Sequence, residues 1–450
     1  MKTRPCSVAL LLASSILLCG CNPVTGESTS ASSTVSVQEI GDDDLANLAE
    51  ALTSNHLAVR LEAIKSLGAA SLDPNSKKAA QVVQWLLDHR RIEFNDYEDR
   101  HVESALRALG PVAVAEVERQ ALSSEISEVS NACEAMRSLG SEFYASFQPL
   151  LTKMLKSDLN EQKWGALYSL EKMGPAGQDL LPLIKPYLTD SDFQLQIIAL
   201  RALAAMGPSA RTHEDIVRDL TTNGQNVSVK SHALRTLGYI SVGDPKQAQA
   251  AAEVIGKNLK EFPFATKSRA LEGLIQLQAN ASPTADVIKE LLHDQTGLAP
   301  QAAVVHGYIT GEWEATLKLL ISLVRDPVVG MECLDLLGKL GPRAAAAEAT
   351  FQAMTKDEDE IVALLAVEGL AGLVKADSPA EFEQLNVEQR QLLDRIATHL
   401  QKLSTQGELE PHHRATVLVD QWKALGWQPP QPAPPQPKQE TPTPQPSPGE

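Results

Sequence analysis

The chain has 450 residues, a formal net charge of −17 and 43% hydrophobic residues, of which few are aromatic. This acidic balance disfavours binding to nucleic acid, where clustered Lys and Arg must meet phosphates, and disfavours attraction to anionic lipid by charge. Since only 4% of the residues are aromatic, the core must consist mainly of Leu, Ala, Val and Ile, which suit closely stacked helices.

The N-terminus has the features of an export leader. Lys2 and Arg4 form a short basic region, and the apolar residues 8–18 that follow are too few to span a bilayer. They end in Leu18-Cys19-Gly20-Cys21, which resembles the bacterial lipobox. The resemblance implies that Cys21 becomes the mature N-terminus and carries lipid on its sulfur. Fatty acids such as palmitate would then anchor the protein, at about 0.8 kcal/mol for each buried methylene.

An ordinary cleaved signal peptide with an incidental Cys is the alternative interpretation of this leader. Asn22 does not match the Asp that resembles an inner-membrane retention signal, so the choice of membrane stays open. We therefore expect a protein of the bacterial cell envelope, lipid-anchored to the inner or outer membrane and facing the periplasm or the exterior.

One sequence phrase recurs about every 30 to 40 residues from Asp44 onwards. It is an apolar helix that closes on Leu-Gly or Met-Gly, often followed by Pro, and its copies are residues 63–68, 105–111, 135–140, 166–175, 199–208, 233–238, 336–342 and 367–372. Each copy follows a first helix whose apolar residues fall at i, i+3, i+4 and i+7, as in residues 44–52. Such self-similarity predicts stacked helix pairs that share one continuous core.

We predict eleven pairs, with second helices that end near Gly68, Gly110, Gly140, Gly174, Gly207, Gly238, Leu277, Gly311, Gly341, Leu373 and Gly426. Glycine is expected to end these helices, Pro to begin the next one, and Asp or Ser to cap the second helix, as at residues 157–158, 190–192 and 326–327. Pairs seven and eight, about residues 247–311, lack the closing Leu-Gly-Pro. Residues 90–99 and 375–386 form longer connections, which are either contact loops or neutral insertions.

This pattern resembles the short bacterial HEAT-like repeat, over most of the chain. The resemblance implies an all-α fold, a right-handed α-solenoid superhelix that binds proteins along its concave face. Arg107, Arg137 and Arg235 occupy a position similar to the family's recurrent basic residue. Near the end of a second helix, such an Arg can satisfy backbone carbonyls or neighbouring acids.

The chain is thus divided into four parts: a lipoprotein signal peptide (1–20), a Ser/Thr-rich flexible tether (21–43), the HEAT-like solenoid (44–427) and a Pro-rich tail (428–450). Ten prolines among the last 23 residues prevent a packed core, so the tail is expected to be disordered with polyproline II character.

For each candidate catalytic or metal-binding residue, a purely structural role is the better interpretation. Cys133 and Cys333 lie in separate apolar helices and are expected to be buried free thiols. The pair His412-His413 points in two directions on a helix, so a metal site is not expected. The acidic residues 356–360 precede an apolar helix, where they complement its dipole. We expect no catalytic, cofactor-binding or metal-binding residue and no cofactor.

The tryptophans are expected to be structural as well. Trp164 and Trp313 fall on helices where burial is expected, and Trp422 and Trp427 would seal the last pair. An aromatic platform for a ligand is the alternative.

From these features we predict a membrane-tethered extracytoplasmic scaffold or adaptor, not an enzyme, that binds protein partners of the cell envelope through its solenoid surface and binds no nucleic acid. Two alternatives stay open. One is a HEAT-type lyase-like enzyme or tetrapyrrole-binding protein, and the other is a purely structural envelope spacer.

Overall fold

The computed structural model describes residues 41–74, 76–92, 96–260, 263–294 and 297–374, together with isolated residues between 383 and 396. In this part of the chain all regular elements are helical, and none of the helices is long and apolar enough to cross a membrane. The twenty α-helices form ten pairs, which we describe as an A helix followed by a B helix. The second helix of the predicted eleventh pair and the tail lie outside the described residues.

The A helices carry odd numbers and are α1 (Asp42–Leu52), α3 (Lys77–Ile92), α5 (Pro111–Ala121), α7 (Tyr144–Leu155), α9 (Leu181–Ile184), α11 (Glu214–Asn223), α13 (Pro245–Leu259), α15 (Ala285–Leu291), α17 (Trp313–Leu323) and α19 (Glu348–Met354). The B helices carry even numbers and are α2 (Leu57–Gly68), α4 (Asp96–Leu109), α6 (Ile126–Leu139), α8 (Asn160–Met173), α10 (Phe193–Met206), α12 (Val227–Ile240), α14 (Phe264–Leu277), α16 (Ala299–Thr310), α18 (Gly330–Leu340) and α20 (Glu360–Val374). The predicted second helices therefore exist, and all but the sixth end within a residue of the expected position.

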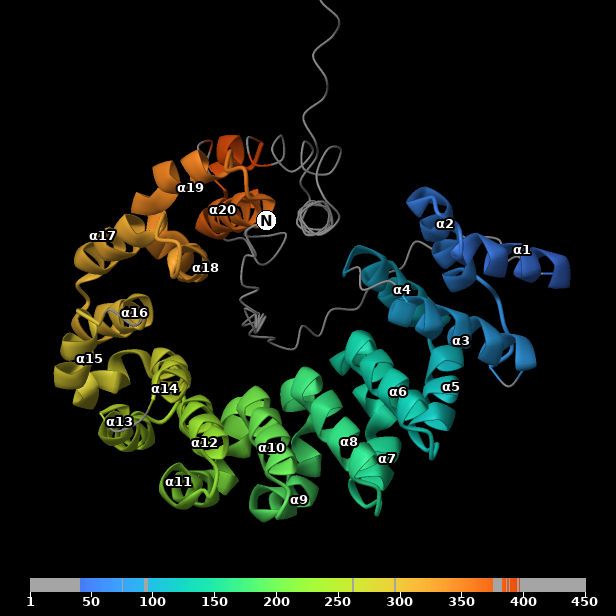
Figure 1. Ribbon diagram of the computed structural model, residues 1–450, viewed down its shortest axis with the longest axis horizontal. Helices are drawn as coiled ribbons and strands as arrows, with labels where there is room; N and C mark the ends of the chain where they lie inside the picture. The colour runs from blue at the N-terminus through green and yellow to red at the C-terminus, as the bar shows by residue number, and fades with distance from the viewer. Residues whose placement is uncertain are drawn as a thin grey trace, which may run out of the picture. The chain divides into compact units, whose positions relative to one another are not determined.

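Each B helix packs against the next B helix and, except for α10, against its own A helix; α10 packs on the 3₁₀ segments that flank the short α9. The described chain is therefore an α-solenoid with two layers (Figure 1). Leu, Ala, Val and Ile dominate the buried side chains, as the composition requires. The buried side chains fall into two clusters, and the half-buried Ile275 packs against both. One buried cluster extends from Leu45 to Val305, and a second begins at Val304 and extends to Ile396. The division falls in α16, within the region that lacks the closing Leu-Gly-Pro.

Most of the repeated glycines end a B helix as expected. Five of them follow the last residue of α4, α6, α8, α10 and α18 with a φ between 52° and 75°, a conformation that suits a residue without a Cβ: Gly110, Gly140, Gly174, Gly207 and Gly341. Pro111 then begins α5 directly. Pro175, Pro208 and Pro342 instead lie in 3₁₀ segments, η2 (Gly174–Leu180), η4 (Gly207–His213) and η6 (Gly341–Ala347), that lead toward the next A helix.

Gly238 does not end its helix, so this prediction was wrong. Helix α12 continues to Ile240, and Gly238 packs against α14 instead. A Cβ on Gly238 would lie 2.3 Å from the carbonyl oxygen and 2.5 Å from the Cα of Gly273. This pair of glycines therefore allows the backbones of α12 and α14 to approach each other closely. The Leu-Gly phrase has two physical functions, helix termination and close helix packing.

Gln278 occupies the position that a terminating glycine holds elsewhere. It follows α14 with φ 52° and ψ −129°, nearly the backbone conformation of Gly174 and Gly207. Among the described residues it is the only non-glycine residue with positive φ. Such a conformation is strained for a side chain with a Cβ, at about 1–3 kcal/mol. The missing Leu-Gly-Pro of pair seven thus leaves the fold intact but locally strained.

The predicted long connections, helix caps and free thiols can be compared with the structure in turn. Residues 90–99 are not a long connection, since α3 extends to Ile92 and α4 begins at Asp96. Residues 375–386 lie largely outside the described residues. Asp192 caps α10, and Asp359 accepts hydrogen bonds from the first backbone amides of α20, as the acidic run predicted. Both thiols, Cys133 and Cys333, are free and buried, and burial raises their pKa to about 12.

Candidate partner-binding face on the B helices

Consecutive B helices present one equivalent position side by side. It is the residue that follows two buried apolar residues in the middle of each helix, and we call the series the B row. In pairs one to six it is basic except for one tyrosine, in pair eight it is a histidine, and in pairs seven, nine and ten it is acidic: Lys65, Arg107, Arg137, Tyr168, Arg201, Arg235, Glu272, His306, Asp335 and Glu368. The B row therefore changes sign along the array.

The first arginines of the B row bind the neighbouring helix, as the sequence predicted. Arg107 donates to the carbonyl oxygen of Ser138 at 2.8 Å, and Arg137 donates to that of Tyr168 at 2.9 Å. The guanidinium of Arg137 also lies 3.7 Å from the centroid of the Tyr168 ring. Arg107 thus reaches a carbonyl in the last turn of α6, where a cation also complements the helix dipole, whereas Arg137 reaches a carbonyl within α8.

The next two arginines pair with acids on neighbouring B helices. Arg201 forms an ion pair with Glu171 at 2.7 Å, and Arg235 forms one with Glu272 at 2.7 Å. The side chain of Arg235 is only 8% exposed, so its pairing is needed to offset desolvation. One turn before the B row, α12 carries His232 and α14 carries Arg269. We call Arg201, Arg235, Arg269 and His232 the arginine cluster.

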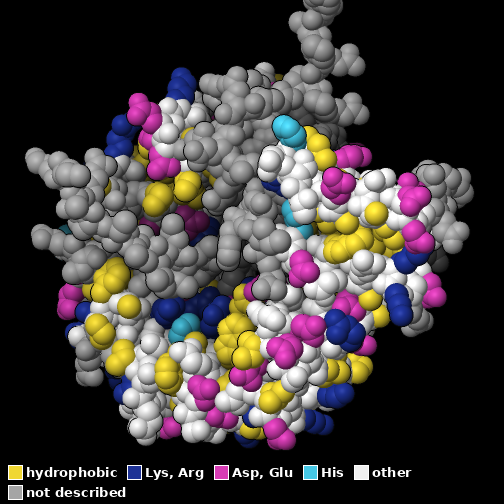
Figure 2. Space-filling model, turned by 45° about the vertical axis from the view of Figure 1, so that its right-hand side comes forward, with side chains coloured by type: hydrophobic (Ala, Val, Ile, Leu, Met, Phe, Trp, Pro, Cys, Tyr) yellow, Lys and Arg dark blue, Asp and Glu magenta, His cyan; other side chains and the backbone are white. Residues whose placement is uncertain are grey.

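The arginine cluster keeps its histidine neutral. Burial of His232, followed by the charges of Arg269, Arg235 and Arg201, lowers its pKa to about 3. Arg269 is half-buried and makes no hydrogen bond or ion pair with any residue that the structure describes. Burial lowers the pKa of its guanidinium, and Arg235 and Arg201 add to this effect although Glu272 opposes it. Figure 2 shows Lys and Arg side chains gathered beside a histidine on the surface.

Sequence reasoning identified only part of this cluster. The Arg-x-Leu-Gly pattern selected Arg107, Arg137 and Arg235. It did not select Arg201, because the residue after Leu203 is Ala204 and not glycine. The preceding Ala-Leu pair, present before both Arg201 and Arg235, was the signal that could have found it. Arg269 has no repeat signal, because its place beside the others depends on how α14 packs on α12.

Trp164 is not buried, contrary to the sequence prediction. It is 39% exposed and stacks on Tyr168, one turn later in α8, with ring centroids 4.6 Å apart. Tyr168 in turn receives the guanidinium of Arg137. This aromatic pair, exposed at Trp164 and half-buried at Tyr168, therefore lies on α8, one turn before Glu171, the acid that pairs with Arg201. Trp313 is half-buried and meets Tyr308 edge to face at 4.9 Å.

The acidic end of the B row begins in α14 and continues in α18. Glu332 lies one turn before Asp335, in the position that His232 and Arg269 hold in their helices. Burial raises the pKa of Glu332 to about 7, and the hydrogen bond from Gln301 opposes this effect. The charge at this position thus passes from cationic to anionic between α14 and α18.

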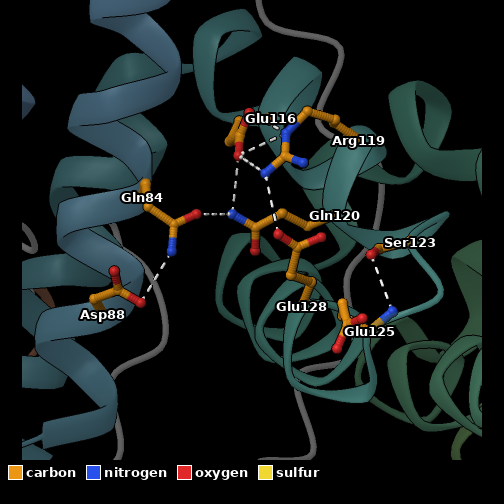
Figure 3. Close-up of polar contacts among 8 residues, drawn as sticks. All are labelled: Gln84, Asp88, Glu116, Arg119, Gln120, Ser123, Glu125 and Glu128. Atoms are coloured by element: carbon orange, nitrogen blue, oxygen red, sulfur yellow. Dashed lines mark hydrogen bonds and ion pairs between the residues drawn. The ribbon is translucent and has the colours of Figure 1, made fainter.

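A second polar group lies between the A helices α3 and α5 and continues to the start of α6 (Figure 3). Gln120, fully buried, donates to Gln84 at 2.6 Å and to Glu116 at 3.0 Å. Arg119 pairs with Glu116 at 2.7 Å and with Glu128 at 3.6 Å. Hydrogen bonding to Glu116 raises the pKa of Arg119. We call this group the A network, and its charges face one another.

An apolar residue projects at the start of many B helices. In five consecutive pairs it is between 43% and 64% exposed: Ile126, Leu159, Phe193, Val227 and Phe264. Exposed apolar groups in a regular series are more typical of interaction surfaces than of a surface that faces water alone. Their spacing follows the repeat, so they accompany the B row along the array.

The other features offer little chemistry. Among the described residues no three His, Cys, Asp or Glu side chains form a group that could hold a metal ion. A depression of about 320 Å³ between α17 and α19 is lined by small and apolar side chains together with Arg325. Cys21, His412, His413, Trp422 and Trp427 lie outside the described residues.

No protein-family model matches the chain, and no curated protein matches it. Solved structures do. They include the crystal structure of Kap121p (13% identity, TM-score 0.35, 84% of this chain and 46% of that one) and that of the karyopherin Kap121p bound to the extreme C-terminus of the protein phosphatase Cdc14p (14% identity, TM-score 0.36, 85% and 46%). The chain thus spans less than half the length of these proteins. A similarity at this level says nothing about what this chain binds.

Proposed function

We propose that this protein is a scaffold or adaptor, without catalytic activity, that binds protein partners through its B helices. The observation that carries the proposal is the B row, since charged and aromatic side chains recur at one position on consecutive, closely packed helices. A preformed surface of this kind orders few groups when it binds, so more of the contact energy remains as affinity. The exposed apolar residues at the B-helix starts add to the same surface.

The proposal places the protein in a bacterial cell envelope, anchored by lipid on Cys21. Its support is the sequence of the leader, in which Leu18 and Gly20 stand where the lipobox has them. Replacing the anchor residue, Cys21→Ala, should move the protein from the membrane fraction to the soluble fraction. Cys19→Ala is the matched control and should leave it on the membrane. Equal membrane recovery of both variants would reject the anchor.

Partner binding is tested by cross-linking in intact cells, followed by affinity purification and mass spectrometry. The full chain is compared with a variant that lacks residues 42–374 but keeps the leader. We expect partner proteins to be lost with the helices. Unchanged recovery of every partner would reject the scaffold. Near-stoichiometric tetrapyrrole absorbance in the purified full chain would favour the tetrapyrrole-binding alternative instead.

A further inference from the structure

The arginine cluster has a surplus of positive charge in a chain that is strongly acidic overall. Together with Arg137 it contains four guanidinium groups, and the acids around them are Glu134, Glu171 and Glu272. Glu171 is shared between Arg137 and Arg201, at 3.7 Å and 2.7 Å. Arg269 is left without an acid in contact. The net charge of the whole chain is −17, so this surplus is local.

The surplus is suited to carboxylates. A guanidinium presents a planar set of five N–H donors that matches a carboxylate in a bidentate pair. The donors of Arg269 have no acceptor among the described residues, and the side chain of Arg201 is 33% exposed despite its pairing with Glu171. Arg201 and Arg269 can therefore each bind a further anion. Partial burial strengthens the attraction between guanidinium and anion, because the local dielectric is low.

The surroundings favour a short protein segment over a nucleic acid. Glu272, Glu332 and Asp335 follow the cluster along the B helices, and they would repel a phosphate backbone that continued past it. On the other side, the exposed Trp164 stacks on the half-buried Tyr168. Trp, Tyr and Arg are the residues that most often dominate protein–protein contacts. The distance from α8 to α14 covers three helix-to-helix steps of about 8–10 Å, which an extended segment of about eight or nine residues spans.

We infer that the arginine cluster is the docking site for an acidic segment of a partner protein, whose carboxylates face Arg201 and Arg269 and whose apolar side chain packs on the Trp164–Tyr168 stack. The inference rests on the proposed function and adds the chemistry of the partner to it. His232 is neutral, so the arginines and not this histidine would bind the carboxylates.

The test measures binding of labelled peptides to the full chain, purified in mild detergent, by fluorescence anisotropy. One peptide has about nine residues with Glu at alternate positions and one Trp, and its match has Gln in place of every Glu. We expect the Glu peptide to bind about tenfold more tightly, and less so as salt is added. Arg269→Gln should weaken binding of the Glu peptide about fivefold. The double variant, Arg201→Gln and Arg269→Gln together, should weaken it more than tenfold. Arg325, which is exposed and follows the A helix α17, is the control: Arg325→Gln should leave binding of the Glu peptide unchanged.

Equal binding of the two peptides, or equal binding by the double variant and the wild type, would overturn the inference. Tighter binding of a single-stranded oligonucleotide of similar length would also overturn it, in favour of a nucleic acid. Circular dichroism melts of each variant separate loss of binding from loss of fold. In cells, partners that cross-link equally to the double variant and to the wild type would reject the acidic docking site while leaving the scaffold intact.

Discussion

The A network and the arginine cluster are both built from long polar side chains on neighbouring helices, yet their charges are balanced differently. In the A network, Arg119 faces Glu116 and Glu128, so cation and anions lie together. In the arginine cluster, three arginines surround a neutral histidine; Arg201 and Arg235 each pair with one acid, and Arg269 has no acid in contact. A group in which every charge has a partner of the opposite sign stabilises the packing of its helices, whereas a cation without an acid in contact is suited to a ligand of the opposite sign. The following predictions test this contrast.

The largest expected effect concerns the helix contact beneath the cluster. Gly238→Val would place a Cβ within 2.5 Å of the Gly273 backbone, so α12 and α14 must separate. We expect a loss of about 3 kcal/mol in the free energy of unfolding and weaker Glu-peptide binding, because Arg235 would move from Glu272. Urea denaturation measures the first quantity. Ala353→Val, on an exposed position of α19, is the control and should change little; similar losses in both variants would contradict the close contact.

The A network should respond in stability alone. Arg119→Met removes the cation from Glu116, whose side chain is only 5% exposed, and we expect a loss of about 2 kcal/mol. Adding Glu116→Leu should recover most of this loss, because the buried anion is then also removed. Thermal denaturation measures both steps. Affinity for the Glu peptide should not change, and a reduced affinity would remove the distinction between the two groups.

The arginine cluster should make stability depend on pH. His232 binds a proton near pH 6.5 when unfolded but only near pH 3 when folded, so the unfolded state binds more protons between these values. Stability must therefore fall as the pH falls from 7 toward 3, by about 1–2 kcal/mol at pH 5 from this residue. Denaturation at pH 7 and pH 5 should show a smaller difference in His232→Gln than in the wild type. The same difference in both would mean that other groups carry the acid sensitivity.

A smaller effect is expected at the strained residue after α14. Gln278→Gly should stabilise the protein by about 1 kcal/mol, since glycine adopts the positive φ of 52° without strain. Gln276→Gly, inside α14, is the matched control and should destabilise by a similar amount, because glycine is a poor helix former. Calorimetric melting temperatures would show opposite signs. Two shifts of the same sign would contradict the backbone conformation described for Gln278.

The smallest expected effect is the most direct check on the comparison. Arg269→Gln should change the free energy of unfolding by less than about 0.5 kcal/mol, because no ion pair is lost and repulsion from Arg235 and Arg201 is relieved. The result is read beside Arg119→Met in the same denaturation assay. If Arg269→Gln were the more destabilising of the two, its surplus charge would have a structural purpose.

The sequence by itself was sufficient for the all-α solenoid, for most B-helix ends and for the expectation that Arg107 and Arg137 bind backbone carbonyls or neighbouring acids. These features depend on neighbours within one helix pair, or on the next pair in a repeating pattern, and the apolar spacing and the glycines record them directly. The leader and Cys21 are likewise predictions of the sequence, still to be tested by membrane fractionation.

Only the tertiary structure decided what each position of that pattern contacts. Gly238 packs instead of ending its helix, Trp164 stacks in solvent instead of filling the core, and Arg269 lies beside Arg235 and Arg201 without an acid of its own. The contacts of Gly238 and Arg269 join residues more than 30 positions apart, and their distance is set by how closely two helices approach. Helix periodicity specifies which face is apolar, but it does not specify which polar side chains meet across the contact between faces.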